Sequence, residues 1–126
     1  MRWRRLIADR RGGAILEYAL VLPVFLLIVV GIMQLGQMLW IQAALQHAVD
    51  MAARCASVNA VSCATAVQVE AYAGTQAYGV ALPADTFTAS TQPCGNQVVA
   101  TYDFSTQTNL LPYTSVSLSA RACYPL

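Results

Sequence analysis

The most regular feature of the sequence is an apolar stretch at residues 14–33, which contains a single charged side chain, Glu17. About 20 helical residues suffice to cross the hydrocarbon core of a bilayer. We therefore expect a membrane-spanning helix whose transmembrane part covers residues 13–36. A cleaved secretory signal is the alternative, but its apolar region is normally about 7–15 residues long and ends at a small-residue cleavage site. The residues after position 33 contain no clear site of that kind.

Helical periodicity continues beyond the apolar stretch. Residues 38–56 contain no proline or glycine, and Asp50 and Arg54 have the spacing of an i,i+4 ion pair. Apolar side chains recur three or four residues apart at Ile41, Leu45, Ala48, Val49, Ala52 and Ala56. The pattern predicts one helix from about residue 14 to about residue 58, with residues 37–58 as its extracytoplasmic continuation. Trp3 and Trp40 bracket the apolar stretch, as interfacial anchors do; a pure packing role is the alternative.

Residues 59–126 have the short-range patterns of a small α+β domain. A turn is expected at residues 59–62, and residues 65–78 predict a second short helix with Gly79 as its C-terminal cap. Residues 86–90 resemble a strand, and alternating apolar and polar positions predict strands at residues 98–104 and 116–122, separated by a polar loop at 105–115. The expected fold class is therefore α+β: a long N-terminal membrane-spanning helix, a short second helix and a small antiparallel sheet.

Four cysteines lie in the part of the chain expected outside the cytoplasm. An even number in a small exported domain indicates two disulfides, and three pairings are arithmetically possible. We favour Cys55–Cys63, which would join the two helices, and Cys94–Cys123, which would join two paired strands. Buried free thiols are the alternative. No metal site is expected, because the sequence has no Cys-x-x-Cys motif and His47 is its only histidine.

Charged residues are sparse and unevenly placed. They make up 10% of the chain, against about 25% in an ordinary soluble domain. Five of the seven basic residues, all arginines, precede the apolar stretch, at positions 2, 4, 5, 10 and 11. The positive-inside rule then places residues 1–12 in the cytoplasm as a basic leader and the C-terminal part outside it. Residues 13–126 carry two arginines against five acidic residues, so no nucleic-acid partner is expected.

The side chains needed for catalysis are scarce. With one histidine and no lysine, the sequence offers no evident nucleophile–base pair and no phosphate-binding loop. We therefore expect neither an enzymatic activity nor a cofactor.

A short motif lies at the start of the apolar stretch. Arg10 and Arg11 precede Gly12 and Gly13, and residues 14–18 read AILEY, ending in Glu17 and Tyr18. Counted from Gly13, Glu17 is the fifth residue. The motif resembles the processing site of type IV pilin precursors, especially of the Flp type. That resemblance implies cleavage between Gly12 and Gly13 by an aspartic prepilin peptidase at the inner face of the membrane.

The same resemblance implies a role in subunit assembly for Glu17 and Tyr18. A carboxylate in an apolar environment is costly unless it finds a partner. The new amine at Gly13, on the same or a neighbouring subunit, is the natural partner of Glu17. An interfacial glutamate that faces lipid headgroups is the alternative.

A longer region, about residues 10–55, is similar to the TadE-like family of pseudopilins, or minor pilins, of the tight-adherence pilus. The similarity includes EYALVLPVF at residues 17–25, QAALQ at 42–46 and AAR at 52–54, and weaker likeness at residues 111–112 and 117–122. It implies a pilin-like fold and a minor pilin that acts in pilus initiation, tip formation or assembly, supporting surface adhesion and biofilm formation.

The family resemblance also implies partners and a location. The expected partners are the inner membrane, a prepilin peptidase, other pilins and pseudopilins, and the pilus assembly platform. The chain would cross the bacterial inner membrane once, with its N-terminus in the cytoplasm and its C-terminal domain in the periplasm, and reach the cell-surface pilus after assembly. A membrane-anchored binding domain and a pseudopilin of a related secretion system are the alternatives.

Overall fold

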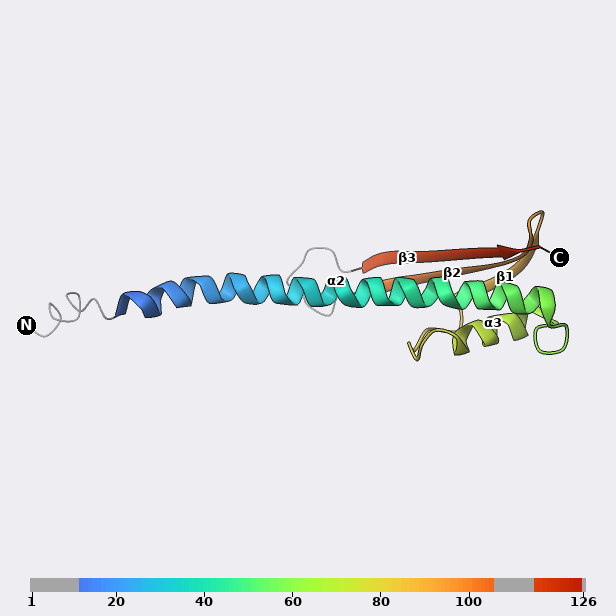
Figure 1. The fold of residues 1–126 in the computed structure, drawn as a ribbon, viewed down its shortest axis with the longest axis horizontal. Helices are drawn as coiled ribbons and strands as arrows, with labels where there is room; N and C mark the ends of the chain where they lie inside the picture. Colours follow the sequence, from blue (N-terminus) through green and yellow to red (C-terminus); the bar gives the residue numbers. More distant parts are fainter. Residues whose placement is uncertain (1–11, 106–114, 126) are drawn as a thin grey trace, which may run out of the picture. The chain divides into compact units, whose positions relative to one another are not determined.

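The computed structural model describes residues 12–105 and 115–125 (Figure 1). Along the chain the elements are α2 (Gly13–Val58), α3 (Ala66–Thr75), β1 (Phe87–Gln92), β2 (Gly95–Ser105) and β3 (Ser115–Tyr124). The expected α+β class, with a long N-terminal apolar helix, a short second helix and a small antiparallel sheet, is confirmed. The chain divides into an N-terminal unit, residues 1–36, and a C-terminal unit, residues 37–126. The leader before Gly12 and most of the polar loop at 105–115 lie outside the described residues.

In the N-terminal unit, the first part of α2 is apolar and exposed. An 18-residue window of α2 has a mean hydropathy of 2.6, and none of that window is buried. Leu22 and Phe25, for example, are 54% and 57% exposed. Among the described residues, α2 is the one helix with the length and composition needed to cross a membrane. Apolar surface of this extent is typical of a helix surrounded by lipid or by other helices.

The C-terminal unit contains a three-stranded sheet in the order β1-β2-β3, with both neighbouring pairs antiparallel. The register places Phe87 opposite Ala100, and Ala100 opposite Ala120. Because alternate residues of a strand point to the same face, one face is apolar and buried while the other is mostly polar. The buried residues of β2 and β3 on this face are Val98, Ala100, Phe104, Leu118, Ala120 and Ala122.

The core of the C-terminal unit joins α2, α3 and the sheet in one buried cluster. Helix α2 contributes mainly alanines, and its larger fully buried side chains are Leu45 and Val49, which accompany Val98 from β2. In Figure 1 the C-terminal part of α2 runs along the strands. Helix α3 contacts β1 and adds Val69 and Ala73 to the cluster.

Two disulfides close this unit, Cys55–Cys63 and Cys94–Cys123. The first links α2 to the segment before α3. The second links the turn between β1 and β2 to β3. These are the two pairings that the sequence favoured.

The second helix is shorter than predicted. It begins as expected after Thr65, whose side chain accepts a hydrogen bond from the Gln68 backbone while Gln68 reaches back, forming a capping box. It ends at Thr75, with Gln76 as its cap, rather than near Tyr78. Tyr78 and Gly79 both have positive φ values, 49° and 74°, which a right-handed helix does not allow. The prediction that Gly79 caps this helix is therefore wrong.

The strands are longer than predicted. Gln92 pairs with Gly95 across a two-residue turn, so β2 begins at Gly95 and not at residue 98. Gly95 has φ 124°, and a Cβ there would collide with the backbone oxygen of Tyr124 and lie 2.7 Å from Cα of Pro125. Only glycine fits this position.

Candidate processing and assembly site

Gly12 and Gly13 lie where the first described residues lead into α2. Gly13 is the first residue of the helix, and Gly12 precedes it. Both are exposed, and a Cβ atom at either position would meet nothing within 4 Å. The peptide bond between them is therefore uncovered by other described parts of the chain, which is a requirement for a protease to reach it.

Glu17 and Tyr18 follow within the first turns of α2. Both are exposed, Tyr18 to 76%. Glu17 comes four residues after Gly13, so the two positions share one face of the helix, one turn apart. No hydrogen bond or ion pair links Glu17 to another residue of the described ranges. The structure thus brings the four predicted residues together at one end of α2.

The electrostatics of this helix end favour a carboxylate. The first turn of α2 contains no acidic residue, so Glu17 is the first negative charge after the helix start. The N-terminus of a helix carries a partial positive charge, whose attraction for a carboxylate is strongest within the first turn. An amine formed at Gly13 would add a full positive charge, and Glu17 would then be its nearest carboxylate along the helix.

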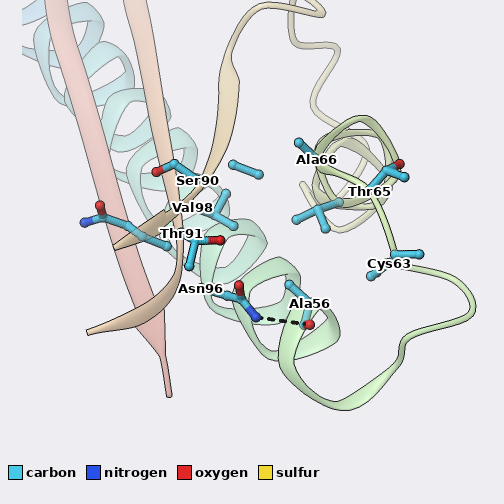
Figure 2. A pocket seen from close by; sticks show the side chains of 12 residues that line it. Ala56, Cys63, Thr65, Ala66, Ser90, Thr91, Asn96 and Val98 are labelled. Atoms are coloured by element: carbon cyan, nitrogen blue, oxygen red, sulfur yellow. Dashed lines mark hydrogen bonds between the residues drawn. The ribbon is translucent and has the colours of Figure 1, made fainter. Parts of the chain in front are cut away.

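The C-terminal unit has a shallow hollow of about 150 Å³ between the end of α2, the start of α3 and the hairpin of β1 and β2 (Figure 2). At its base, Nδ2 of Asn96 donates hydrogen bonds to the backbone oxygen of Ala56, at 3.2 Å, and to Oγ of Ser57, at 3.3 Å. The Ala56 oxygen belongs to the last turn of α2, whose carbonyls lack helical partners. Asn96 therefore caps α2, a role the sequence analysis missed because its partners are about 40 residues away in the chain.

The side chains around this hollow are small, apolar or uncharged, and contain no ionisable group, since its one cysteine, Cys63, is in a disulfide. In the described part of the chain, no three His, Cys, Asp or Glu side chains cluster to hold a metal ion. We assign the hollow a packing role and place the candidate site at residues 12–18.

Comparison with known proteins supports the same region. The family model described as TadE-like protein matches residues 12–54. The match begins at the candidate cleavage site, includes the apolar stretch and ends near the first disulfide. It confirms the resemblance to the TadE-like family over this third of the chain, and residues 55–126 lie outside it. No curated protein and no solved structure gave a significant match.

Proposed function

We propose that the protein is a minor pilin or pseudopilin. Residues 12–54 match the TadE-like family, and this match associates the chain with tight-adherence pili. Its leader is removed between Gly12 and Gly13 by a prepilin peptidase. The processed chain then takes part in the initiation, tip formation or assembly of the pilus and so supports surface adhesion.

The observation that carries the proposal is the exposed apolar part of α2, with a single carboxylate near its start. Such a helix is stable in lipid, and it is equally stable when helices of other subunits take the place of the lipid. In the second environment Glu17 leaves the interface and becomes surrounded by apolar side chains. A carboxylate in that position is strongly unfavourable unless a cation pairs with it. Cleavage creates such a cation at Gly13.

The C-terminal unit suits a subunit that moves from membrane to filament. Its core is small and rich in alanine, and two disulfides hold the hairpin and the helix corner together. Domains of this size gain much of their stability from such cross-links. The disulfides require an oxidising compartment, which is consistent with a periplasmic location for this unit.

The experiment that tests the proposal is mass spectrometry of the mature N-terminus in a host with the matching prepilin peptidase. We expect the native chain to begin at Gly13. The Gly12→Ala variant should keep its leader, because in this proposal the peptidase recognises a residue without a Cβ atom before the cleaved bond. Gly31→Ala is the matched control: it changes another exposed glycine of α2 with open space around it, and it should be processed normally.

The outcomes separate the alternatives. A native chain that retains residues 1–12 would contradict the processing step and favour a membrane-anchored binding domain that never polymerises. A processed chain that is found with a secretion machinery and never with pilus subunits would favour the pseudopilin of a secretion system.

A further inference from the structure

Three aromatic side chains form a cluster on the surface of the C-terminal unit. The ring of Tyr78 stacks on that of His47, with centroids 4.6 Å apart and planes 25° apart. It also contacts Trp40, at 6.1 Å and 46°. Trp40 and Tyr78 are 60% and 59% exposed, and His47 is partly buried. We call Trp40, His47 and Tyr78 the aromatic patch.

The backbone at Tyr78 is held in an unfavourable conformation. Among residues 12–105 and 115–125, Tyr78 is the only non-glycine residue with positive φ. A bulky side chain in this region is rare and indicates that the surrounding structure needs that conformation. Here it places the Tyr78 ring, from the connection between α3 and β1, on the surface of α2 between Trp40 and His47.

The position of Trp40 in α2 corresponds to a membrane boundary. Trp40 follows Tyr18 by 22 residues. A helix of that length rises about 33 Å, against about 30 Å for the hydrocarbon core. If Glu17 and Tyr18 lie at the cytoplasmic interface, Trp40 therefore lies at the outer one.

The chemistry of the patch also matches the headgroup layer. Tryptophan and tyrosine concentrate at membrane interfaces, where the ring contacts apolar chains and its polar edge contacts water and headgroups. Residues 18–49 contain no Asp, Glu, Lys or Arg. In this part of α2, therefore, no charged side chain opposes transfer from water into the interfacial layer.

From the aromatic patch, we propose that the C-terminal unit docks on the outer surface of the membrane, with Trp40 and Tyr78 in the phospholipid headgroup layer. The inference rests on the membrane-held state of the proposed function. Because the patch contains no arginine, lysine or carboxylate, the contact is with the interfacial layer in general, and anionic lipid is not required.

Depth-dependent quenching by brominated lipids tests the docking. The full chain is reconstituted in phosphatidylcholine vesicles that carry bromine either near the headgroups or deep in the acyl chains. Three chains with a single tryptophan are compared, and all of them carry Trp3→Phe. The first retains Trp40. The other two carry Trp40→Phe, and each has a new tryptophan, through Tyr78→Trp in one and Tyr124→Trp in the other. Tyr124 is the control: it is 41% exposed, and its backbone oxygen accepts a hydrogen bond from Ser57, 17 residues beyond Trp40 in α2.

We expect shallow bromine to reduce the fluorescence at positions 40 and 78 more strongly than deep bromine does, because interfacial aromatic residues lie at the headgroup level. Position 124 should be unaffected. Adding phosphatidylglycerol should not change this pattern. Quenching at position 40 with none at position 78 would overturn the docking and leave the membrane span intact. No quenching at position 40 would contradict the membrane span itself, and with it the proposed function.

A second measurement avoids substituting Tyr78, in case that variant fails to fold. Tyrosine-ring NMR signals of the native chain in nanodiscs are recorded with and without a lipid whose headgroup carries gadolinium. Broadening of the Tyr78 signal, with a sharp Tyr124 signal, is the expected result. Equal sharpness of both signals would overturn the contact with lipid.

Discussion

At the scale of single residues, the proposed assembly role of α2 rests on Glu17. In the structure it is exposed near the start of the helix, one turn after Gly13. The sequence motif selects Glu17 as a candidate, and its role in assembly stays a prediction. The partner proposed for Glu17 is the amine at Gly13, on the same or a neighbouring subunit, and an uncleaved chain does not contain that amine.

We therefore expect Glu17→Ala to leave insertion and cleavage unchanged while reducing incorporation into pili at least about tenfold, because removing one member of a buried ion pair costs about 3–5 kcal/mol. Quantitative immunoblotting of sheared pili, against the membrane fraction, measures this. Leu27→Ala, at another exposed position of α2, is the control and should assemble nearly normally. Normal assembly of Glu17→Ala would refute the role of this carboxylate.

Two glycines give a matched pair for the fold itself. Gly95→Ala should destabilise the C-terminal unit by at least about 2 kcal/mol, through the unfavourable φ and the collision with the Tyr124 backbone. Gly74→Ala in α3 meets nothing within 4 Å and should stabilise it by up to about 1 kcal/mol, since alanine is the better helix former. Urea unfolding in detergent micelles, followed by pulse proteolysis, measures both. Equal stability of the two variants would contradict the described turn.

Some contacts at this scale could not be read from spacing. The pair Asp50 and Arg54 has favourable i,i+4 spacing, but within the described part of the chain Asp50 instead accepts hydrogen bonds from Gln46, at 3.3 and 3.4 Å. Both partners are exposed, where such contacts differ by only a few tenths of a kcal/mol. Periodicity gives the face of a helix but not the choice among exposed polar neighbours.

At the scale of elements, both outer strands form hydrogen bonds with side chains of the helices. Nε2 of Gln42 in α2 donates to the backbone oxygen of Ser119 in β3, at 2.8 Å. The backbone N–H of Ala89 in β1 donates to Oε1 of Glu70 in α3, at 3.0 Å. Unpaired edge groups invite pairing with other chains, so these side chains both orient the helices and cover part of the edges.

Glu70 allows this element contact to be tested. Glu70→Ala removes the acceptor from the Ala89 N–H and should lower the free energy of unfolding by about 1–2 kcal/mol, because hydrogen bonds to charged groups contribute about 1.5–3 kcal/mol and this one is only partly buried. Glu70→Gln keeps an oxygen acceptor and should lose less than half as much. Urea midpoints of the two variants decide the matter. The contact would be dispensable if alanine and glutamine behaved alike.

The sequence predicted the presence of each helix and strand more accurately than the residues at which it begins and ends. The start of α3 carries a local signal, Thr65 with Gln68, and was located correctly. The end of α3 has no such local signal. Tyr78 lies beyond it in a non-helical conformation, and its ring contacts Trp40 and His47 of α2. Tertiary contacts of this kind override local helix propensity, and no spacing rule reveals them.

At the scale of the whole molecule, the proposed function requires the C-terminal unit to lie outside the cytoplasm. The two disulfides lie in the C-terminal unit, and all the cysteines lie after residue 54. A C-terminal unit left in the reducing cytoplasm would keep its thiols free. The oxidation state of the cysteines in living cells therefore shows on which side of the membrane the C-terminal unit lies.

Replacing all five leader arginines by glutamine should abolish the positive-inside signal and leave a substantial fraction of chains with free thiols, since the basic residues nearest the first span set its orientation. Replacing Arg54 and Arg121, which are exposed in the C-terminal unit, by glutamine is the control and should leave both disulfides formed. Thiol alkylation in intact cells, followed by mass measurement, counts the free cysteines in each variant. Fully oxidised cysteines in the leader variant would show that orientation does not depend on those arginines, and that the length and apolar character of α2 alone carry the C-terminal unit across.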